Sequence, residues 1–244
     1  MLEKDVEMKN LITCLTVSVL SVATFADTWT VDDDGKADFD NIQDAVDASS
    51  DGDEIIVMPG TYTSTADVVV NMLGKAVWVH SSDGQEVTII DGEGARRGIL
   101  CDSGETSKTI IEGFTITNGY SSGNGGGMSN KSNSNPTLTN CTFTNNTADE
   151  IGGGMFNSYS SPTLDGCTFT GNTAFYGGGG MCNNNSSPTL TDCTFDGNSA
   201  DLLGGGMYNF ESSPTLENCT FTGNTAANGG GMSNYYSSSP TLDG

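Results

Sequence analysis

A repeat of about 26 residues runs through the second half of the chain and constrains its fold more than any other feature. Within each repeat, a proline is followed two positions later by a leucine, and the first four repeats add a phenylalanine. These positions are Pro136, Pro162, Pro188, Pro214 and Pro240; Leu138, Leu164, Leu190, Leu216 and Leu242; and Phe143, Phe169, Phe195 and Phe221. A fixed period of this length indicates a solenoid, in which each repeat stacks on its neighbours.

The residues inside one repeat alternate as they do in β-strands. In the segment Cys-Thr-Phe-Thr, the Cys and Phe side chains point to one side and the two Thr side chains to the other. Gly and Asn recur too often for helices of several turns. The sequence therefore predicts an all-β fold, a right-handed parallel β-helix with three strands per coil and coils about 4.8 Å apart. Its inward columns are predicted to contain Met155, Met181 and Met207, and Leu164, Leu190 and Leu216.

The first half follows the same plan less regularly. A short N-terminal capping helix is expected, with Asp40 as its N-cap and Gln43 at the third position. Phe39, Ile42 and Val46 would form its apolar stripe, and Gly52 would end it. Strands are expected at residues 55–58, 68–70, 77–79, 87–90 and 109–117. In the last of these, Ile111 and Ile116 lie 27 residues before Leu138 and Phe143, close to the repeat length. The irregular coils are therefore expected to run directly into the regular ones.

The order of these segments predicts a signal peptide followed by one domain. The leader is predicted over residues 1–26: from Met8 the sequence has one lysine, an apolar run and small residues before Asp27, which is typical of a secretory signal. Residues 1–7 are interpreted as a mis-assigned start. The β-helix domain is expected over 27–244, with an N-terminal cap at 27–53, irregular coils at 54–118 and regular repeats at 119–244. The chain stops within a repeat, so we expect a C-terminal truncation and self-association through the open last coil.

Charge narrows the choice of partners. The net charge is −23, and no Lys, Arg or His follows Lys131. Phosphate groups require cationic side chains, so nucleic acid and anionic lipid are excluded as partners. The mature chain is expected to have no transmembrane segment, because the one apolar run lies in the leader and is too short to span a bilayer.

Two columns of polar and sulfur-containing side chains are expected to run from coil to coil. The asparagines that follow each repeat methionine should form a hydrogen-bonded ladder, and the repeat cysteines should form a stack of reduced thiols. The asparagines are Asn130, Asn157, Asn183, Asn209 and Asn234; the cysteines are Cys141, Cys167, Cys193 and Cys219. No metal or cofactor is expected, because no CxxC pair occurs and the Asp32–Gly35 run lacks the spacing of an EF-hand loop.

Two stretches resemble known families. The segment FDNIQDAVDASSDGDEIIVMPGTYT, residues 39–63, is similar to the opening of pectin-lyase-like proteins, in which a capping helix leads into the first coil. The repeated GGGM and FxxN motifs resemble the repeats of chlamydial polymorphic outer-membrane proteins. The first resemblance implies a β-helix that hosts lyases, hydrolases, esterases or adhesins. Such enzymes would use a Lys or Arg base with calcium-binding acids, or clustered carboxylates.

Few residues are candidates for a functional site. The acids of the regular repeats are scattered and have no base beside them, so no catalytic residue is assigned. In the first half, Trp78 and His80 are expected to point outward from one strand, with Arg96 and Arg97 following; together they could bind a sugar. The alternative is that Trp78 packs under a turn and His80 is ordinary surface.

The function that these features favour is that of an exported, non-enzymatic surface protein that adheres to glycans or other cell surfaces, in association with an outer membrane. A first alternative is a polysaccharide lyase or hydrolase with its site in the first-half coils. A second is a flat, ice-binding-like face formed by pairs of outward threonines. These pairs are Thr142/Thr144, Thr168/Thr170 and Thr220/Thr222, interrupted at Thr194/Asp196.

Overall fold

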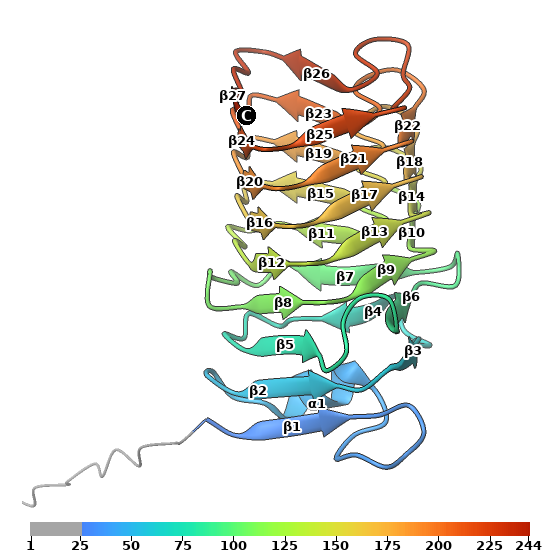
Figure 1. Cartoon of the computed structure of the whole chain (residues 1–244), viewed down its shortest axis with the longest axis vertical. Helices are drawn as coiled ribbons and strands as arrows, with labels where there is room; N and C mark the ends of the chain where they lie inside the picture. The colour runs from blue at the N-terminus through green and yellow to red at the C-terminus, as the bar shows by residue number, and fades with distance from the viewer. Residues whose placement is uncertain (1–25) are drawn as a thin grey trace, which may run out of the picture.

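The computed structural model describes residues 26–244, which form a column of stacked coils above a short helix at the N-terminal end (Figure 1). The strands pair in parallel, each with its counterpart in the next coil. This confirms the predicted parallel β-helix, with one coil for each repeat of the second half. The expected leader falls on residues 1–25, outside the described part, apart from Ala26.

Three long sheets form the sides of the column. Sheet 1 contains β1 (Thr28–Val31), β2 (Glu54–Val57), β5 (Trp78–Ser81), β8 (Ile110–Glu112), β12 (Thr137–Thr139), β16 (Thr163–Asp165), β20 (Thr189–Thr191), β24 (Thr215–Glu217) and β27 (Thr241–Asp243). Sheet 2 contains β3 (Gly60–Tyr62), β6 (Thr88–Asp91), β9 (Thr115–Thr117), β13 (Thr142–Thr144), β17 (Thr168–Thr170), β21 (Thr194–Asp196) and β25 (Thr220–Thr222). Sheet 3 contains β4 (Val68–Asn71), β7 (Arg97–Cys101), β11 (Met128–Asn130), β15 (Met155–Ser158), β19 (Met181–Asn184), β23 (Met207–Phe210) and β26 (Met232–Tyr235).

A fourth, narrow sheet supplements the three predicted strands of each regular coil. Sheet 4 contains the two-residue strands β10 (Tyr120–Ser121), β14 (Thr147–Ala148), β18 (Thr173–Ala174) and β22 (Ser199–Ala200). Its alanines point inward and are buried, whereas Thr147 and Thr173 are exposed. The small alanine side chains leave room for the larger side chains of the other three sheets.

The core is built from columns of identical side chains. Successive leucines pair in sheet 1, phenylalanines in sheet 2 and methionines in sheet 3, as the repeat predicted. Phe143, Phe169, Phe195 and Phe221 stack with ring centroids 4.7–4.8 Å apart and planes within 5° of parallel. This distance matches the spacing of neighbouring strands, so the backbone ladder itself sets the ring stack.

The corners of the coil explain why Asn, Asp and Gly punctuate the repeat. Between sheets 1 and 2, Asn140, Gly166, Asp192 and Asn218 all have φ between 50° and 60°. This left-handed conformation is reached readily only by Gly, Asn and Asp. The chain therefore turns at the same point in every coil.

The N-terminal cap differs in detail from the prediction. Helix α1 (Ile42–Ala48) is capped by Asn41, whose side chain accepts a hydrogen bond from the Asp44 backbone N–H at 2.9 Å; Asp40 is not the cap. The helix ends at Ala48 with Ser49 as C-cap, before Gly52. Phe39 precedes the helix, where it forms an isolated bridge with Val31 and packs edge-on against Trp29. The buried face of α1 is Ile42, Ala45 and Val46.

Most expected first-half strands are present, shifted by about one residue at their ends. The run at 109–117 is two strands, β8 and β9, because Gly113 turns the corner between them at φ 75°. Strands β1, β3 and β7 were not predicted. The expected pairings of Ile111 with Leu138 and of Ile116 with Phe143 are confirmed.

In the last coil, the side chain of Leu242 is 66% exposed. The expected self-association through this coil stays a prediction. Over residues 26–244, no helix has the length and apolar character needed to cross a membrane.

Candidate functional site

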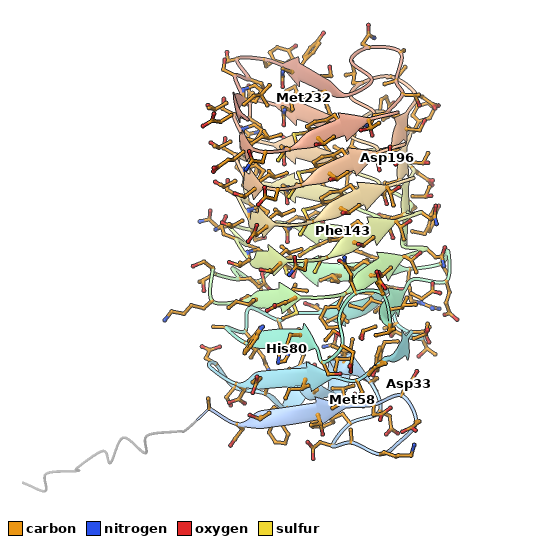
Figure 2. All side chains as sticks on the ribbon, in the orientation of Figure 1. Asp33, Met58, His80, Phe143, Asp196 and Met232 are labelled. Atoms are coloured by element: carbon orange, nitrogen blue, oxygen red, sulfur yellow. The ribbon has the colours of Figure 1, made fainter. Side chains whose placement is uncertain are left out.

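An aromatic pair stands on the outer face of sheet 1 at β5. Val77 and Val79 are buried, so the alternation of the strand turns Trp78 and His80 outward. The Trp78 side chain is 39% exposed, and its ring stacks on the His80 ring with centroids 4.1 Å apart and an interplanar angle of 24°. His80 lies in the lower, first-half part of the column in Figure 2.

Two glutamates on the neighbouring strands hold this pair in place. Glu54 on β2 and Glu112 on β8 flank β5 in sheet 1. The Trp78 Nε1–H donates to Glu112 Oε2 at 3.0 Å, and His80 Nε2 lies 3.1 Å from Glu54 Oε1. His80 Nδ1 lies 3.2 Å from the Ser81 carbonyl oxygen. Both ring nitrogens therefore have polar partners, which fix the orientation of the ring.

Apolar side chains and a groove extend the surface around the rings. Ile56 pairs in register with His80 and Ile110 with Trp78, and both isoleucines are half-buried on the same outer face. On one side of Trp78 lies a groove of about 790 Å³, rimmed by the turn residues Thr106, Ser107 and Lys108. We call Trp78, His80, Glu54, Glu112 and this groove the Trp78 surface.

One acid in this groove has a structural role. Asp53 is buried and accepts hydrogen bonds from the backbone N–H groups of Asp27 and Ser50 at 2.8 Å and from Trp29 Nε1 at 3.2 Å. Burial by itself would raise the pKa of Asp53, but the three donors outweigh it and hold the pKa below its usual value. The carboxylate therefore stays charged, and its hydrogen bonds to Asp27, Ser50 and Trp29 hold the first coil in place.

The two arginines predicted to join Trp78 and His80 lie elsewhere. Arg96 is in the turn between β6 and β7, where it pairs with Glu93. Arg97 begins β7 in sheet 3, and its guanidinium donates to the carbonyls of Gly125 and Asn124 at 2.8 Å. Burial lowers the pKa of Arg97. The structure thus brings together only two of the four candidates and adds Glu54 and Glu112, which the sequence did not single out.

The predicted asparagine column lies inside the coil. Each side-chain amide donates to the next Oδ1 at 2.8–2.9 Å, from Asn130 through Asn157, Asn183 and Asn209 to Asn234. A second ladder, missed from the sequence, uses the asparagine of each FxxN motif: Asn146, Asn172, Asn198 and Asn224. In the first ladder the amides bond to one another, and in the second they bond to one another and to the backbone. These bonds give both columns a structural role.

The repeat cysteines are free thiols in the structure. Each Sγ donates to the carbonyl two residues earlier, over 3.2–3.5 Å, in Cys141, Cys167, Cys193 and Cys219. Cys101 and Cys182 are fully buried, and burial raises the pKa of each thiol. A buried thiol with a raised pKa is a poor nucleophile.

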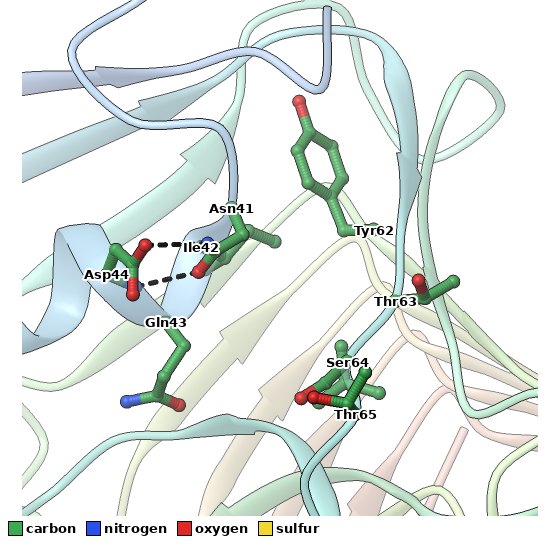
Figure 3. A pocket seen from close by; sticks show the side chains of 9 residues that line it. Asn41, Ile42, Gln43, Asp44, Tyr62, Thr63, Ser64 and Thr65 are labelled. Carbon is green, nitrogen blue, oxygen red and sulfur yellow. Dashed lines mark hydrogen bonds between the residues drawn. The ribbon is translucent and has the colours of Figure 1, made fainter. Parts of the chain in front are cut away.

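A further groove, of about 380 Å³, lies where helix α1 faces the end of β3 (Figure 3). Several of its polar side chains already have partners. Asn41 both donates to and accepts from Asp44, and the Tyr62 hydroxyl donates to the Met58 carbonyl at 2.8 Å. Burial raises the pKa of Tyr62 to about 12.

The threonine pairs occupy the outer face of sheet 2, and Asp196 interrupts their second column (Figure 2). The first threonines of the row are partly covered, because Thr115 donates to the Gln85 carbonyl and Thr142 to the Gln85 side chain. Among the described residues, no group of three or more His, Cys, Asp or Glu side chains is placed to hold a metal ion.

Comparison with known proteins identifies the fold. The family described as right-handed β-helix region matches residues 71–244. A solved structure, pectin methylesterase from carrot, superposes with a TM-score of 0.49 at 12% identity, over 89% of this chain and 84% of that one. No curated protein sequence matches the chain. The likeness of the repeats to chlamydial outer-membrane proteins stays an expectation.

Proposed function

The chain belongs to the right-handed β-helix family, and from this premise we propose that it is an exported, non-enzymatic binding protein that holds neutral glycans on its Trp78 surface. The supporting observation is the exposed Trp78–His80 stack, oriented by a carboxylate on each side. An aromatic ring offers a flat apolar face to the C–H groups of a sugar, and carboxylates accept hydrogen bonds from its hydroxyls.

The charges of the surface favour a neutral glycan over an acidic one. Glu54 and Glu112 lie beside the rings, and the whole chain has a net charge of −23. A uronate would bring a further negative charge next to these carboxylates, which costs binding energy. Ile56 and Ile110 extend the apolar area onto both neighbouring strands, as expected for a surface that receives more than one sugar ring.

Binding of this kind would suit an exported protein that adheres to polysaccharides or cell surfaces. Export and an outer-membrane association are part of the proposal, supported by the leader-like residues 1–26.

The experiment is to titrate the protein with a panel of neutral and acidic polysaccharides, by affinity electrophoresis and calorimetry. We expect saturable binding to at least one neutral member, weakened about tenfold or more by Trp78→Ala. The matched control is Thr163→Ala, an exposed residue in the same outward column of sheet 1. Binding that is equal in Trp78→Ala and the parent protein, or absent throughout the panel, contradicts the proposal.

A polysaccharide-cleaving enzyme is the second candidate, because His80 and two carboxylates share one exposed surface and could transfer protons. It predicts release of new chain ends from one member of the same panel. Glu112→Gln and Glu54→Gln should then abolish cleavage while Trp78→Ala weakens substrate affinity. The absence of new chain ends with a glycan that binds favours the non-enzymatic proposal.

A flat ice-binding-like face is the third candidate, and the threonine rows of sheet 2 favour it. Thermal hysteresis in the parent protein, lost on Thr170→Lys, would support it.

A further inference from the structure

A third groove, distinct from the Trp78 surface and from the groove at α1, lies on the outer side of sheet 3 in the regular coils. It has a volume of about 320 Å³, and we call it the Tyr208 groove. Its aromatic lining is Tyr176, Tyr208 and Phe210; its aliphatic lining is Ile151 and Leu203. The volume lies at the lower end of the range for small-molecule sites.

The groove arises where the repeat departs from its own pattern. Ile151, Gly177 and Leu203 occupy equivalent positions in three consecutive turns and bridge one another in parallel. Gly177 leaves a gap between two bulky side chains, and the Tyr208 ring fills part of it: a Cβ on Gly177 would lie 3.0 Å from the ring atom Cδ1. Because Gly177 has no side chain, the Tyr208 ring packs directly against this turn.

Aromatic side chains gather around this groove. Phe175 packs edge-on against Tyr176 with centroids 5.0 Å apart, and the Tyr176 side chain is 51% exposed. Phe210 on β23 pairs in register with Tyr235 on β26. Exposed rings grouped on one face of a solvated repeat protein indicate a binding surface.

Acidic residues stand on the turns beside the groove. Tyr176 N–H donates to the Glu150 carbonyl at 2.7 Å, and Asp201 N–H donates to the Phe175 carbonyl at 3.1 Å. Exposed acids therefore lie on the turns on both sides of the Phe175–Tyr176 turn. No Lys, Arg or His occurs in residues 132–244, and the last cation of the chain, Lys131, lies over the Phe156 ring, 5.8 Å from its centroid.

Aromatic faces attract cations through the ring quadrupole, and an uncompensated acidic field concentrates cations near the surface. An anionic ligand would be repelled. A bare metal ion requires several oxygen or nitrogen ligands, which this mainly apolar groove does not supply. We propose that the Tyr208 groove binds a small soluble organic cation, a quaternary ammonium group with an apolar body.

This proposal does not rest on glycan binding, because Trp78 lies on sheet 1 and the Tyr208 groove lies on sheet 3. An experiment that refutes glycan binding at Trp78 therefore leaves the proposal for the Tyr208 groove standing, and the reverse also holds.

The test uses choline and its neutral carbon isostere, in which a tert-butyl group replaces the trimethylammonium group. Calorimetry or ligand-observed NMR on the full chain measures both affinities. We expect saturable choline binding, with the isostere bound about two- to thirtyfold more weakly. Choline affinity should fall with added salt, since the acids that attract it are exposed.

Two variants locate the binding. Tyr176→Leu retains apolar area but removes a ring, and should weaken choline binding by about two- to thirtyfold. Tyr159→Leu is the control, because Tyr159 is 65% exposed and does not line the groove. Glu150→Gln with Asp201→Asn should weaken choline and leave the isostere unchanged. Equal affinity for choline and the isostere, no saturable binding of choline, or an unchanged affinity in Tyr176→Leu would each overturn the proposal.

Discussion

Asn172→Leu should destabilise the β-helix far more than its single position suggests. Asn172 is buried in the second asparagine ladder, and its Oδ1 accepts two hydrogen bonds of 3.0 Å, from the backbone N–H and the Nδ2 of Asn146. Its own Nδ2 donates to the Phe143 carbonyl and to Asn198 Oδ1 at 2.9 Å. Leucine has a similar branched shape but provides none of these groups.

The magnitude follows from the donors left without an acceptor. Asn146 is buried, so its two abandoned N–H groups gain no water in exchange. A buried donor without a partner costs about 1–3 kcal/mol, which gives a loss of about 2–6 kcal/mol in the free energy of unfolding. The free energy of unfolding of a typical domain is only about 5–15 kcal/mol in total.

Urea denaturation followed by circular dichroism measures this loss. The control is Thr173→Ala, an exposed position in the same coil, which should stay within about 0.5 kcal/mol of the parent protein. If Asn172→Leu and Thr173→Ala have the same urea midpoint, the ladder does not stabilise the fold and the reasoning is refuted.

Three further predictions concern the core, pH and the thiols. Phe195→Ala should cost about 3–5 kcal/mol by opening a cavity in the ring stack, whereas Thr194→Ala should stay within about 0.5 kcal/mol; comparable urea midpoint shifts would contradict the assignment of faces. The pKa of Asp53 is lowered in the folded chain, so its contribution to stability is present above its unfolded pKa of about 4 and is lost as the pH falls below that value. Asp53→Asn should flatten the acid side of a plot of urea midpoint against pH, and an unchanged slope would count against the three hydrogen bonds. Cys101 and Cys182 should react with iodoacetamide only after unfolding, and mass spectrometry showing rapid labelling of the native chain would refute their burial.

The regular coils were predictable because one strong constraint repeats. Leu164, Phe169 and Met181 recur at fixed spacing, and strand alternation leaves one choice of inward face. The first coils lack this help, because Glu54, Trp78 and Ile110 are equivalent in register but unequally spaced along the chain. Alignment by period therefore could not place Glu54 and Glu112 beside Trp78.

Local patterns also admitted near-equivalent choices. Asp40 and Asn41 are both good N-cap residues by type. Only the backbone conformation in the structure shows that Asn41 is the cap. The FxxN asparagines form a visible motif, but nothing in the sequence says whether Asn146 points inward or outward at a corner. Arg97 was expected near Trp78 because it lies nearby in the chain, but the chain passes through β6 of sheet 2 and then places Arg97 on β7 of sheet 3.

Fluorescence of Trp78 during titration with a neutral oligosaccharide tests the central functional claim most directly. Trp29 and Trp78 are the two tryptophans of the chain, so a Trp29→Phe variant reports on Trp78 alone. Because Trp78 is 39% exposed, stacking of a sugar ring should shift its emission to shorter wavelength, saturably and with the affinity measured by calorimetry. Saturable binding of the oligosaccharide without any change in Trp78 emission would place the glycan elsewhere and contradict the account.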